Sequence, residues 1–190
     1  YGRLLKRASN QQISAVGLTL SPEQQRFCQD RGLDVRVQDF FTASTAQFQV
    51  ANRFAPFDAI IANGSMEHAQ SVHEAASGLG DERYRLMFHQ ARNLLKEGGR
   101  FVTTIIHQRT GHEFDPREFT AGSTHHHPKS LNGMMQEILE YMGGWYPLPG
   151  QLERCARGIF NLENEVDGTD DYRITSEYWL KMIRRRMLYP

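Results

Sequence analysis

The chain has 190 residues, of which 39% are hydrophobic and 23% are charged, as in an ordinary globular domain. Its 22 basic and 22 acidic side chains balance to a formal net charge of zero, which argues against nucleic acid as a partner. Two cysteines are too few for a disulfide framework, and no apolar run is long enough to cross a membrane. We therefore predict one domain over residues 1–190, working in the reducing cytoplasm.

The first half of the chain alternates helix and strand patterns. The expected elements are, in chain order, a helix over 2–9, a strand over 13–20, a helix over 22–30, strands over 33–37 and 58–62 with a polar connection over 42–52 between them, a helix over 83–96 and a strand over 101–106. Ser21 and Pro22 are typical of a helix beginning, and Gly98 and Gly99 of a helix end. This alternation predicts an α/β fold, a three-layer, doubly wound and mostly parallel sheet with helices on both faces.

After residue 106 the alternation weakens. Residues 107–150 form an excursion whose first part, 108–129, has few apolar residues, which is typical of a lid or a substrate-binding segment. A helix over 130–141 is expected to turn its apolar side chains inward, namely Leu131, Met134, Met135, Ile138 and Leu139. The remaining expected elements are an aromatic turn over 143–149, a helix over 151–157, a strand over 160–166 and a helix over 176–188.

Chemically distinctive side chains stand where the predicted strands end. They are Thr19, Leu20, Asp39, Phe40, Asn63 and Gly64. Each alone could simply cap a helix or fill a turn. Together they favour a nucleotide-like cofactor, because the carboxyl ends of parallel strands meet at one crevice. Asp39 and Thr19 could then hold ribose hydroxyls, and Phe40 offers a flat face to a purine.

Several ionisable residues are candidates for acid–base chemistry. Glu67 follows the third strand and is either a favourable acid at a helix start or a functional carboxylate. His107 follows the fourth strand at the mouth of the crevice, and Tyr172 either points inward or is an ordinary core tyrosine. The run of histidines at 125–127 is more typical of an exposed loop than of a metal site, and Glu67 and His68 diverge on a helix. We predict no metal site.

Six segments resemble the cyclopropane-fatty-acyl-phospholipid synthase group of S-adenosylmethionine-dependent methyltransferases. They are GLTLSPEQQ (17–25), RVQDF (36–40), FDAIIANGSMEH (57–68), LLKEGGRFV (94–102), GGWYP (143–147) and DDYRITSEYW (170–179). The resemblance implies a Rossmann-like class I methyltransferase fold, with S-adenosylmethionine at the strand ends and S-adenosylhomocysteine as product. Tyr1 and Gly2 resemble the end of the family's glycine-rich loop, so the N-terminal strand and most of that loop are expected to be absent from this chain.

The resemblance also implies roles for individual residues. It implies cofactor contacts for Gly2, Thr19, Leu20, Gln24, Asp39, Phe40 and Asn63. It further implies that Glu67 helps to hold a bicarbonate ion, the base in cyclopropanation, with Tyr172 near that ion. The histidine that the family carries on its fourth strand is Thr104 here. His107 would face the opposite side of the strand from Thr104, unless the strand has ended by then.

We predict an S-adenosylmethionine-dependent methyltransferase that methylates or cyclopropanates carbon in an unsaturated lipid-like or small-molecule acceptor. Glu67, Tyr172 and His107 are the predicted catalytic residues. Three alternatives stay open: an O- or N-methyltransferase of a small molecule, an NAD-dependent oxidoreductase without a visible phosphate-loop fingerprint, and a non-catalytic cofactor-binding domain. Transient contact with a membrane surface and self-association also stay open.

Overall fold

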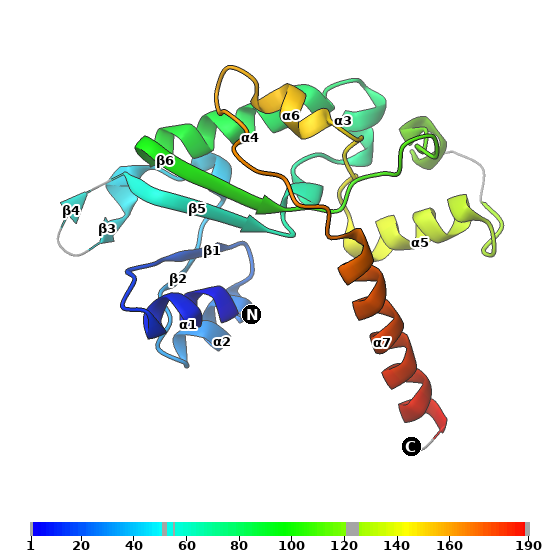
Figure 1. Ribbon diagram of the computed structural model, residues 1–190, viewed down its shortest axis with the longest axis horizontal. Coiled ribbons are helices and arrows are strands. Elements are labelled where there is room, and N and C mark those ends of the chain that lie inside the picture. The colour runs from blue at the N-terminus through cyan, green and yellow to red at the C-terminus, as the bar shows by residue number, and fades with distance from the viewer. Residues whose placement is uncertain (1, 51–52, 55, 121–125, 189–190) are drawn as a thin grey trace. The chain divides into compact units, whose positions relative to one another are not determined.

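The computed structural model describes residues 2–50, 53–54, 56–120 and 126–188, and it divides into two compact units, residues 1–160 and 161–190. Each unit is described by itself. The first unit contains the helices α1 (Arg3–Asn10), α2 (Pro22–Gln29), α3 (Val72–Ala76), α4 (Gly80–Leu94), α5 (Leu131–Met142) and α6 (Gln151–Ala156). Its strands are β1 (Gly17–Thr19), β2 (Val35–Val37), β3 (Gln49–Val50), β4 (Arg53–Phe54), β5 (Phe57–Asn63) and β6 (Leu95–Thr104) (Figure 1).

The strands of the first unit form three pairs. β1 pairs with β2 and β5 pairs with β6, both in parallel, while β3 and β4 form a short antiparallel hairpin. Parallel strands alternating with helices confirm the predicted α/β class. The strands do not form the single continuous sheet that was predicted, because no described backbone hydrogen bond joins β1 to β5. Leu18 of β1 and Ile60 of β5 nevertheless pack on the same buried cluster of Ala43, Phe48 and Leu94, so the two pairs share a core through side chains.

The predicted beginning of α2 is confirmed in detail. The Ser21 hydroxyl accepts a hydrogen bond from the Gln24 N–H at 3.2 Å, and Pro22 occupies the first turn, where its missing N–H costs nothing. The helix packs on β1–β2 through Cys28, which is buried with Leu33 and Val35. This cap fixes where the chain leaves β1, and therefore where the side chains that follow that strand lie.

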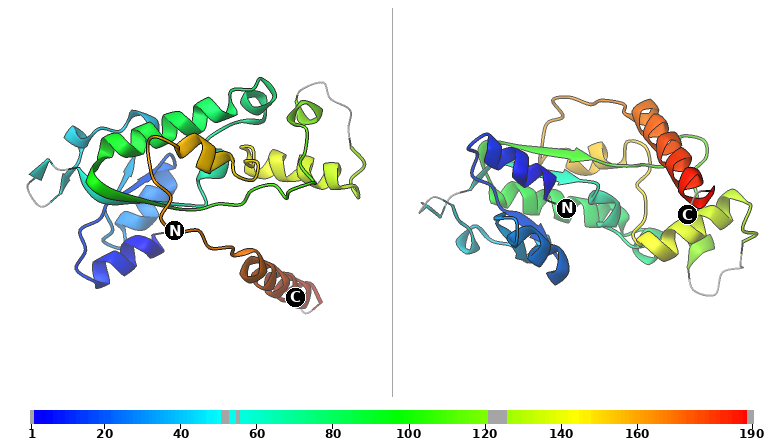
Figure 2. Two further views of the ribbon diagram at one scale, coloured as in Figure 1. Left: turned by 45° about the horizontal axis from the view of Figure 1, so that its top comes forward. Right: turned by 90° about the horizontal axis from the view of Figure 1, so that it is seen from below.

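Helix α4 lies along one face of the β5–β6 pair and contributes Tyr84, Met87 and Phe88 to the main core (Figure 2). Its buried side chains recur at helical spacing, as expected for an amphipathic helix: Tyr84, Met87, Phe88, Ala91 and Leu94. Phe88 meets Phe101 of β6 edge to face, with ring centroids 5.8 Å apart. α6 lies beside α4, where Arg154 forms an ion pair with Asp81 at 3.0 Å. This layer supports the ends of β5 and β6 from one side.

Replacing Phe88 with alanine is expected to lower the free energy of unfolding by about 3–5 kcal/mol, because a fully packed aromatic ring leaves a cavity. Phe88 is 4% exposed. Leu86 on the same helix is 47% exposed, so Leu86→Ala is a matched control that should change stability by about 0.5 kcal/mol or less. Urea unfolding monitored by circular dichroism measures both values, and equal losses would contradict the assigned packing.

The predicted end of the helix over 83–96 was wrong. α4 ends at Leu94, and the chain becomes extended at Leu95, which is 4% exposed and pairs with Phe57 of β5. The next residue of β5 in register is Ala59, which pairs with Arg100, so the segment with Gly98 and Gly99 is an irregularity inside β6. Leu95 is buried like Leu94 before it, and it starts β6 by pairing with Phe57.

The predicted inner face of the helix over 130–141 was also wrong in part. α5 buries Gly133 and Met135, whereas Leu131, Met134 and Ile138 are 67%, 53% and 38% exposed. The Ser130 hydroxyl caps this helix by accepting the Gly133 N–H at 3.0 Å. The helix therefore buries only a narrow face, formed by Gly133 and Met135, and leaves most of its apolar residues at the surface.

The second unit contains the helix α7 (Thr169–Leu188), preceded by a segment without regular structure. The strand predicted over 160–166 was wrong: Leu162 and Val166 are 66% and 79% exposed, and no described strand pairs with the segment. Helix α7 begins seven residues earlier than predicted, at Thr169, whose N–H donates to Asp167 at 2.9 Å. None of the helices that the structure describes combines the length and apolarity needed to span a membrane.

Candidate functional site

The carboxyl ends of β5 and β6 are held together by polar contacts. Asn63 pairs with Thr104 in the strand register, and the Thr104 hydroxyl donates to the Asn63 side-chain oxygen at 2.7 Å. The Gly64 N–H donates to the Thr104 carbonyl at 3.0 Å, which directs the chain away from the sheet. The loop after β5 thereby passes close to the end of β6, where it reaches Glu67.

Glu67 is a buried carboxylate at this edge. It lies in the turn η3 (Met66–His68) and is 6% exposed. Its Oε1 accepts a hydrogen bond from the Ile106 N–H at 2.8 Å, and its main-chain carbonyl accepts one from the Trp145 N–H at 3.0 Å. Its Oε2 is buried and has no hydrogen-bond partner within the described part of the chain. A buried oxygen of this kind is able to accept a proton or a hydrogen bond from a ligand.

The buried Tyr84 lies close enough to feel the charge of this carboxylate, and the buried Gln70 bonds to Tyr84; we call Glu67, Gln70 and Tyr84 the Glu67 cluster. The Gln70 amide donates to the Tyr84 hydroxyl at 3.2 Å and to the Trp145 carbonyl at 3.4 Å. Burial raises the pKa of Tyr84 well above its usual range; the Gln70 hydrogen bond opposes this, and the nearby charge of Glu67 adds to it. Tyr84 therefore remains a neutral hydrogen-bonding group.

The residues predicted to contact a cofactor lie mainly where β1 and β2 end. The Thr19 hydroxyl donates to the Gln24 side chain at 2.8 Å, and Leu20 beside it is 73% exposed. The Gln38 N–H donates to the Thr19 carbonyl at 3.0 Å, which brings the start of the next segment, Asp39, to the same edge. The structure thus places Asp39 at the same edge as Thr19, as expected for neighbouring strand ends, and Gln24, implied only by the resemblance, contacts Thr19 there.

Two of these residues also support the surrounding backbone. One Asp39 side-chain oxygen accepts the Phe41 N–H at 2.9 Å and caps the turn η1 (Phe40–Thr42), and the other oxygen takes no part in this cap. Phe40 is half-buried and packs between two core clusters, so its ring serves the core as well. Among the described residues, no hydrogen bond joins this group to Asn63 on the other strand pair.

Gly2 stands at the beginning of α1 in a tight turn. Its φ angle is 74°, and a Cβ at this position would lie 2.7 Å from Leu33 Cδ1 and 3.1 Å from Cys28 Sγ. Only glycine fits both the left-handed conformation and the close approach. The helix that follows begins at Arg3, one residue after its predicted start.

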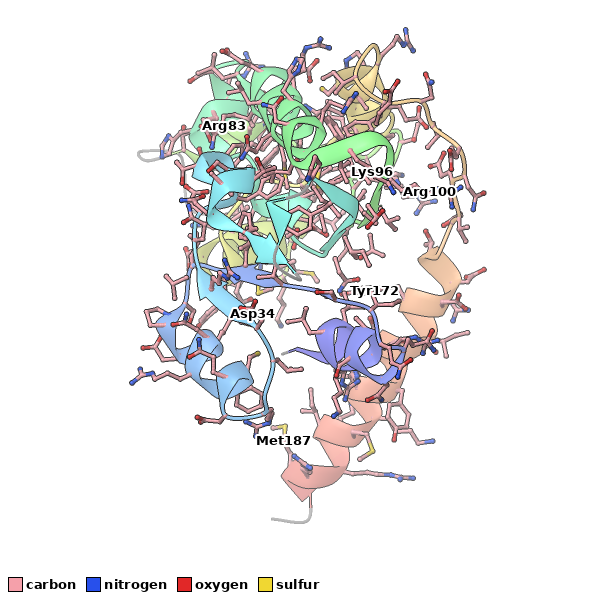
Figure 3. The ribbon with its side chains drawn as sticks, turned by 90° about the vertical axis from the view of Figure 1, so that its left-hand side faces the viewer. Asp34, Arg83, Lys96, Arg100, Tyr172 and Met187 are labelled. Atoms are coloured by element: carbon pink, nitrogen blue, oxygen red, sulfur yellow. The ribbon has the colours of Figure 1, made fainter. Side chains whose placement is uncertain are left out.

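The other two predicted catalytic residues are placed differently from Glu67. His107 is exposed beyond the end of β6, and its Nδ1 lies 2.7 Å from the Gln108 carbonyl. Because β6 ends at Thr104, strand periodicity does not determine which way His107 points. Tyr172 belongs to α7 in the second unit, is 52% exposed, and packs edge to face against Trp179 (Figure 3). Their catalytic roles stay predictions.

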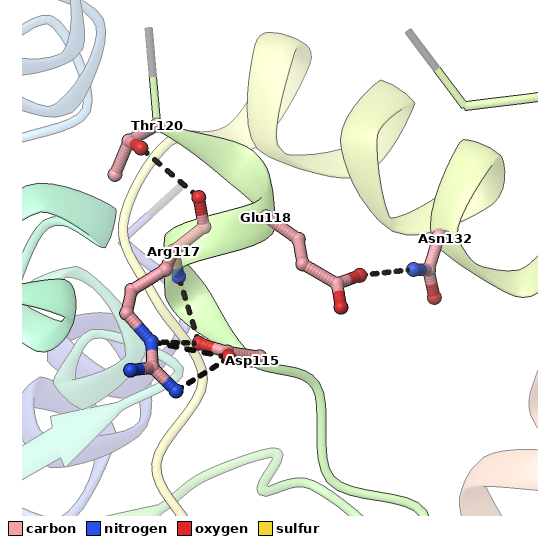
Figure 4. Close-up of polar contacts among 5 residues, drawn as sticks. All are labelled: Asp115, Arg117, Glu118, Thr120 and Asn132. Carbon is pink, nitrogen blue, oxygen red and sulfur yellow. Dashed lines mark hydrogen bonds and ion pairs between the residues drawn. The ribbon is translucent and has the colours of Figure 1, made fainter. Parts of the chain in front are cut away.

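The excursion over 107–150 is held by aromatic and polar contacts. Phe119 packs against Phe114, His126 and Trp145, with ring centroids 5.9, 5.1 and 5.7 Å apart. The turn η4 (Pro116–Phe119) is joined to α5 by a 2.7 Å hydrogen bond from Asn132 to Glu118 (Figure 4). His125 lies outside the described residues, and within the described ranges no three His, Cys, Asp or Glu side chains gather as a metal site would require.

A family model described as mycolic acid cyclopropane synthetase matches residues 1–184. The chain belongs to the mycolic acid cyclopropane synthetase family. The predicted resemblance to S-adenosylmethionine-dependent cyclopropane synthases is thereby confirmed. Comparison with curated protein sequences finds no match.

A solved structure supports the fold of this mycolic acid cyclopropane synthetase family member. The cyclopropane synthase MmaA2 from Mycobacterium tuberculosis is similar with a TM-score of 0.56 and 24% sequence identity. The similarity covers 86% of this chain and 53% of that chain, so this chain spans about half the length of the MmaA2 structure. At 24% identity the comparison supports the fold alone, and any argument about the reaction depends on the residues of this chain.

Sequence reasoning found Glu67 but missed the buried polar network beside it. Trp145 donates to Glu67, Gln70 joins Trp145 to Tyr84, and Gln108 bonds to Tyr146, the neighbour of Trp145. The motif GGWYP was a usable signal, because its paired glycines and aromatic residues marked a rigid turn. The two glutamines gave no signal, since nothing local in the sequence distinguishes a buried glutamine from an exposed one.

Proposed function

We propose that this chain forms the cofactor-binding and catalytic part of an S-adenosylmethionine-dependent methyltransferase that adds carbon to an unsaturated lipid acceptor, by methylation or cyclopropanation. The observation that carries the proposal is Glu67, a buried carboxylate with one unpartnered oxygen at the edge of a parallel strand pair. Family membership supports the cofactor and the lipid acceptor as substrates. A cytoplasmic location remains part of the proposal.

The residues at the ends of β1 and β2 fit the cofactor. When bound, S-adenosylmethionine supplies an electrophilic methyl group on a positively charged sulfur. Asp39 and Thr19 place a carboxylate oxygen and a hydroxyl at one edge, which suits ribose hydroxyls. The exposed Leu20 gives an apolar surface beside them.

Glu67 is suited to the acceptor side of the reaction. Positive charge that develops on an alkene carbon is stabilised by a nearby carboxylate, most strongly where water is excluded. Glu67 is buried, its Oε1 is fixed by the Ile106 N–H, and its Oε2 is available to accept a proton. The chain's own residues therefore hold a negative charge and a proton acceptor in one place.

The residues around Glu67 fit a bicarbonate ion only in part. The unpartnered Glu67 Oε2 suits a ligand that carries a hydroxyl group, as bicarbonate does. The family's histidine is Thr104 here, and the Thr104 hydroxyl already donates to Asn63. The proposed chemistry therefore rests on Glu67 itself. The same Thr104–Asn63 contact favours O- or N-methylation of a small molecule as the second candidate, since that reaction needs no such ion.

Binding of S-adenosylhomocysteine to the full-length protein tests the cofactor site. Calorimetric titration is expected to give a dissociation constant in the micromolar range or below. Asp39→Ser keeps an oxygen for the cap but removes the carboxylate, and it should weaken binding about tenfold or more because a hydrogen bond to a charged group is lost.

A second aspartate provides the matched control for this titration. Asp34 stands before β2, at the opposite end from Asp39, and forms an ion pair with Arg36 at 3.1 Å (Figure 3). Asp34→Ser should leave the dissociation constant within about twofold, since it removes only an exposed pair of small energetic weight. No binding by the unaltered protein would overturn the proposed function, and equal effects of both variants would overturn the site.

A further inference from the structure

Two separate segments hold Glu67 in place. The first is the exit of β6, where the Ile106 N–H donates to Glu67 Oε1 at 2.8 Å. The second is the aromatic turn, where the Trp145 N–H donates to the Glu67 carbonyl at 3.0 Å. Neither donor belongs to a regular element, because β6 ends at Thr104 and α5 ends at Met142. Both donors therefore need another contact to fix their positions.

Gln108 is the residue that joins these two segments. It is 5% exposed and lies two positions beyond Ile106. Its N–H donates to the Pro147 carbonyl and its side-chain amide to the Tyr146 carbonyl, both at 2.8 Å. Its side-chain oxygen accepts the Phe114 N–H at 2.7 Å. One buried side chain therefore links the β6 exit, the aromatic turn and the start of the excursion.

We propose that Gln108 is a positioning residue for Glu67. The contacts form a closed ring: Glu67 to Ile106, along the chain to Gln108, across to Tyr146, back along the chain to Trp145, and from there to Glu67. Loss of the Gln108 side-chain amide leaves only the hydrogen bond from its main-chain N–H to the Pro147 carbonyl across the ring, so both donors are held less firmly against the carboxylate. The consequence for catalysis rests on the proposed function, whereas the consequence for the backbone does not.

The chain offers a matched control in Gln151, another buried glutamine. Gln151 is 6% exposed, accepts the Leu148 N–H at 2.9 Å and donates to Asp81 at 2.8 Å. It has the same chemistry and a similar burial, but its side chain joins the aromatic turn to α4 and not to the β6 exit. A general effect of losing a buried amide should therefore appear equally in both variants.

Amide hydrogen exchange, resolved to single residues by NMR, tests the positioning directly. Gln108→Met removes both side-chain hydrogen bonds at nearly constant volume. It is expected to speed exchange of the Ile106 and Trp145 amides by about tenfold, because each loses part of its support. Gln151→Met is expected to leave both rates within about twofold. Unchanged rates in Gln108→Met, or equal changes in both variants, would overturn the proposal.

Gln108→Glu serves where Gln108→Met does not fold. It keeps an oxygen for the Phe114 N–H and replaces the donor to the Tyr146 carbonyl with a carboxylate oxygen, which repels that carbonyl. Exchange at Trp145 should therefore rise while exchange at Phe114 stays unchanged, and a rise at neither or at both would contradict the assigned contacts.

Steady-state kinetics with unsaturated phospholipid vesicles and S-adenosylmethionine separate positioning from substrate binding. Gln108→Met should lower kcat about tenfold with KM for S-adenosylmethionine unchanged, and Gln151→Met should change neither. An unchanged kcat in Gln108→Met alongside faster exchange would overturn the catalytic consequence. Absence of methyl transfer in every protein, alongside the expected exchange rates, would overturn the proposed function and leave the positioning of Glu67 standing.

Discussion

Glu67→Gln is expected to lower kcat for methyl transfer by about 100-fold or more, because the substitution removes the negative charge and the proton acceptor together. The fold should tolerate the change, since the glutamine side-chain oxygen replaces Oε1 as acceptor for the Ile106 N–H. Affinity for S-adenosylhomocysteine should be nearly unaltered, because the predicted cofactor residues lie mainly on the other strand pair. Transfer of a labelled methyl group to unsaturated phospholipid measures the first value, and calorimetry the second.

An exposed carboxylate provides the control for that experiment. Glu153 lies at the surface of α6, so Glu153→Gln removes the same charge without touching the Glu67 cluster. It should leave kcat and unfolding free energy nearly unchanged. Unaltered turnover in Glu67→Gln would reject the catalytic assignment, and parallel losses in both variants would point to net charge instead.

Gly144→Ala is expected to destabilise the protein by about 2–4 kcal/mol and to abolish most activity, because it combines backbone strain with a steric clash. The φ angle of Gly144 is 75°, and an added Cβ would overlap the Glu67 carbonyl oxygen and lie 3.1 Å from its carbonyl carbon. The alanine therefore pushes directly on the backbone of the catalytic candidate. Urea unfolding and the methyl-transfer assay measure the two effects.

The neighbouring glycine separates the two contributions. Gly143 also has a positive φ of 65°, with a ψ of −171°, but a Cβ there would meet nothing within 4 Å. Gly143→Ala should cost only the backbone strain, about 1–3 kcal/mol, and should retain most activity. If both variants lost the same stability and activity, the contact between Gly144 and Glu67 would have no special importance.

The fold was most predictable where local chemistry decides the outcome. Ser21 and Pro22 begin α2 as predicted, because a cap and a fixed φ act within one turn of helix. Gly98 and Gly99 led to a wrong prediction of a helix end, because paired glycines are equally typical of a helix end and of an irregularity in a strand. What decided between them was the burial of Leu95, which depends on packing against distant parts of the chain. The strand expected over 160–166 failed because a strand needs a partner, which one segment alone cannot specify.

The candidate site was predictable to a similar extent. Glu67, Thr19 and Asp39 were found because parallel strands place polar residues at their carboxyl ends. The contacts that hold Glu67 come from distant parts of the chain. Ile106, for example, lies 39 positions away, and no local sequence pattern indicates such a pairing. Gln108 was therefore invisible in the sequence, although GGWYP was recognised as a rigid turn.

The two parallel strand pairs have a consequence for how ligands act on this protein. Their shared core is made of side chains without a connecting backbone ladder. A ligand that contacts Asp39 on one pair and Asn63 on the other would work as a non-covalent cross-link. Its binding would stabilise the whole unit, so the melting temperature should rise with occupancy. At a ligand concentration a hundredfold above the dissociation constant, the free energy of unfolding should rise by about 2.7 kcal/mol.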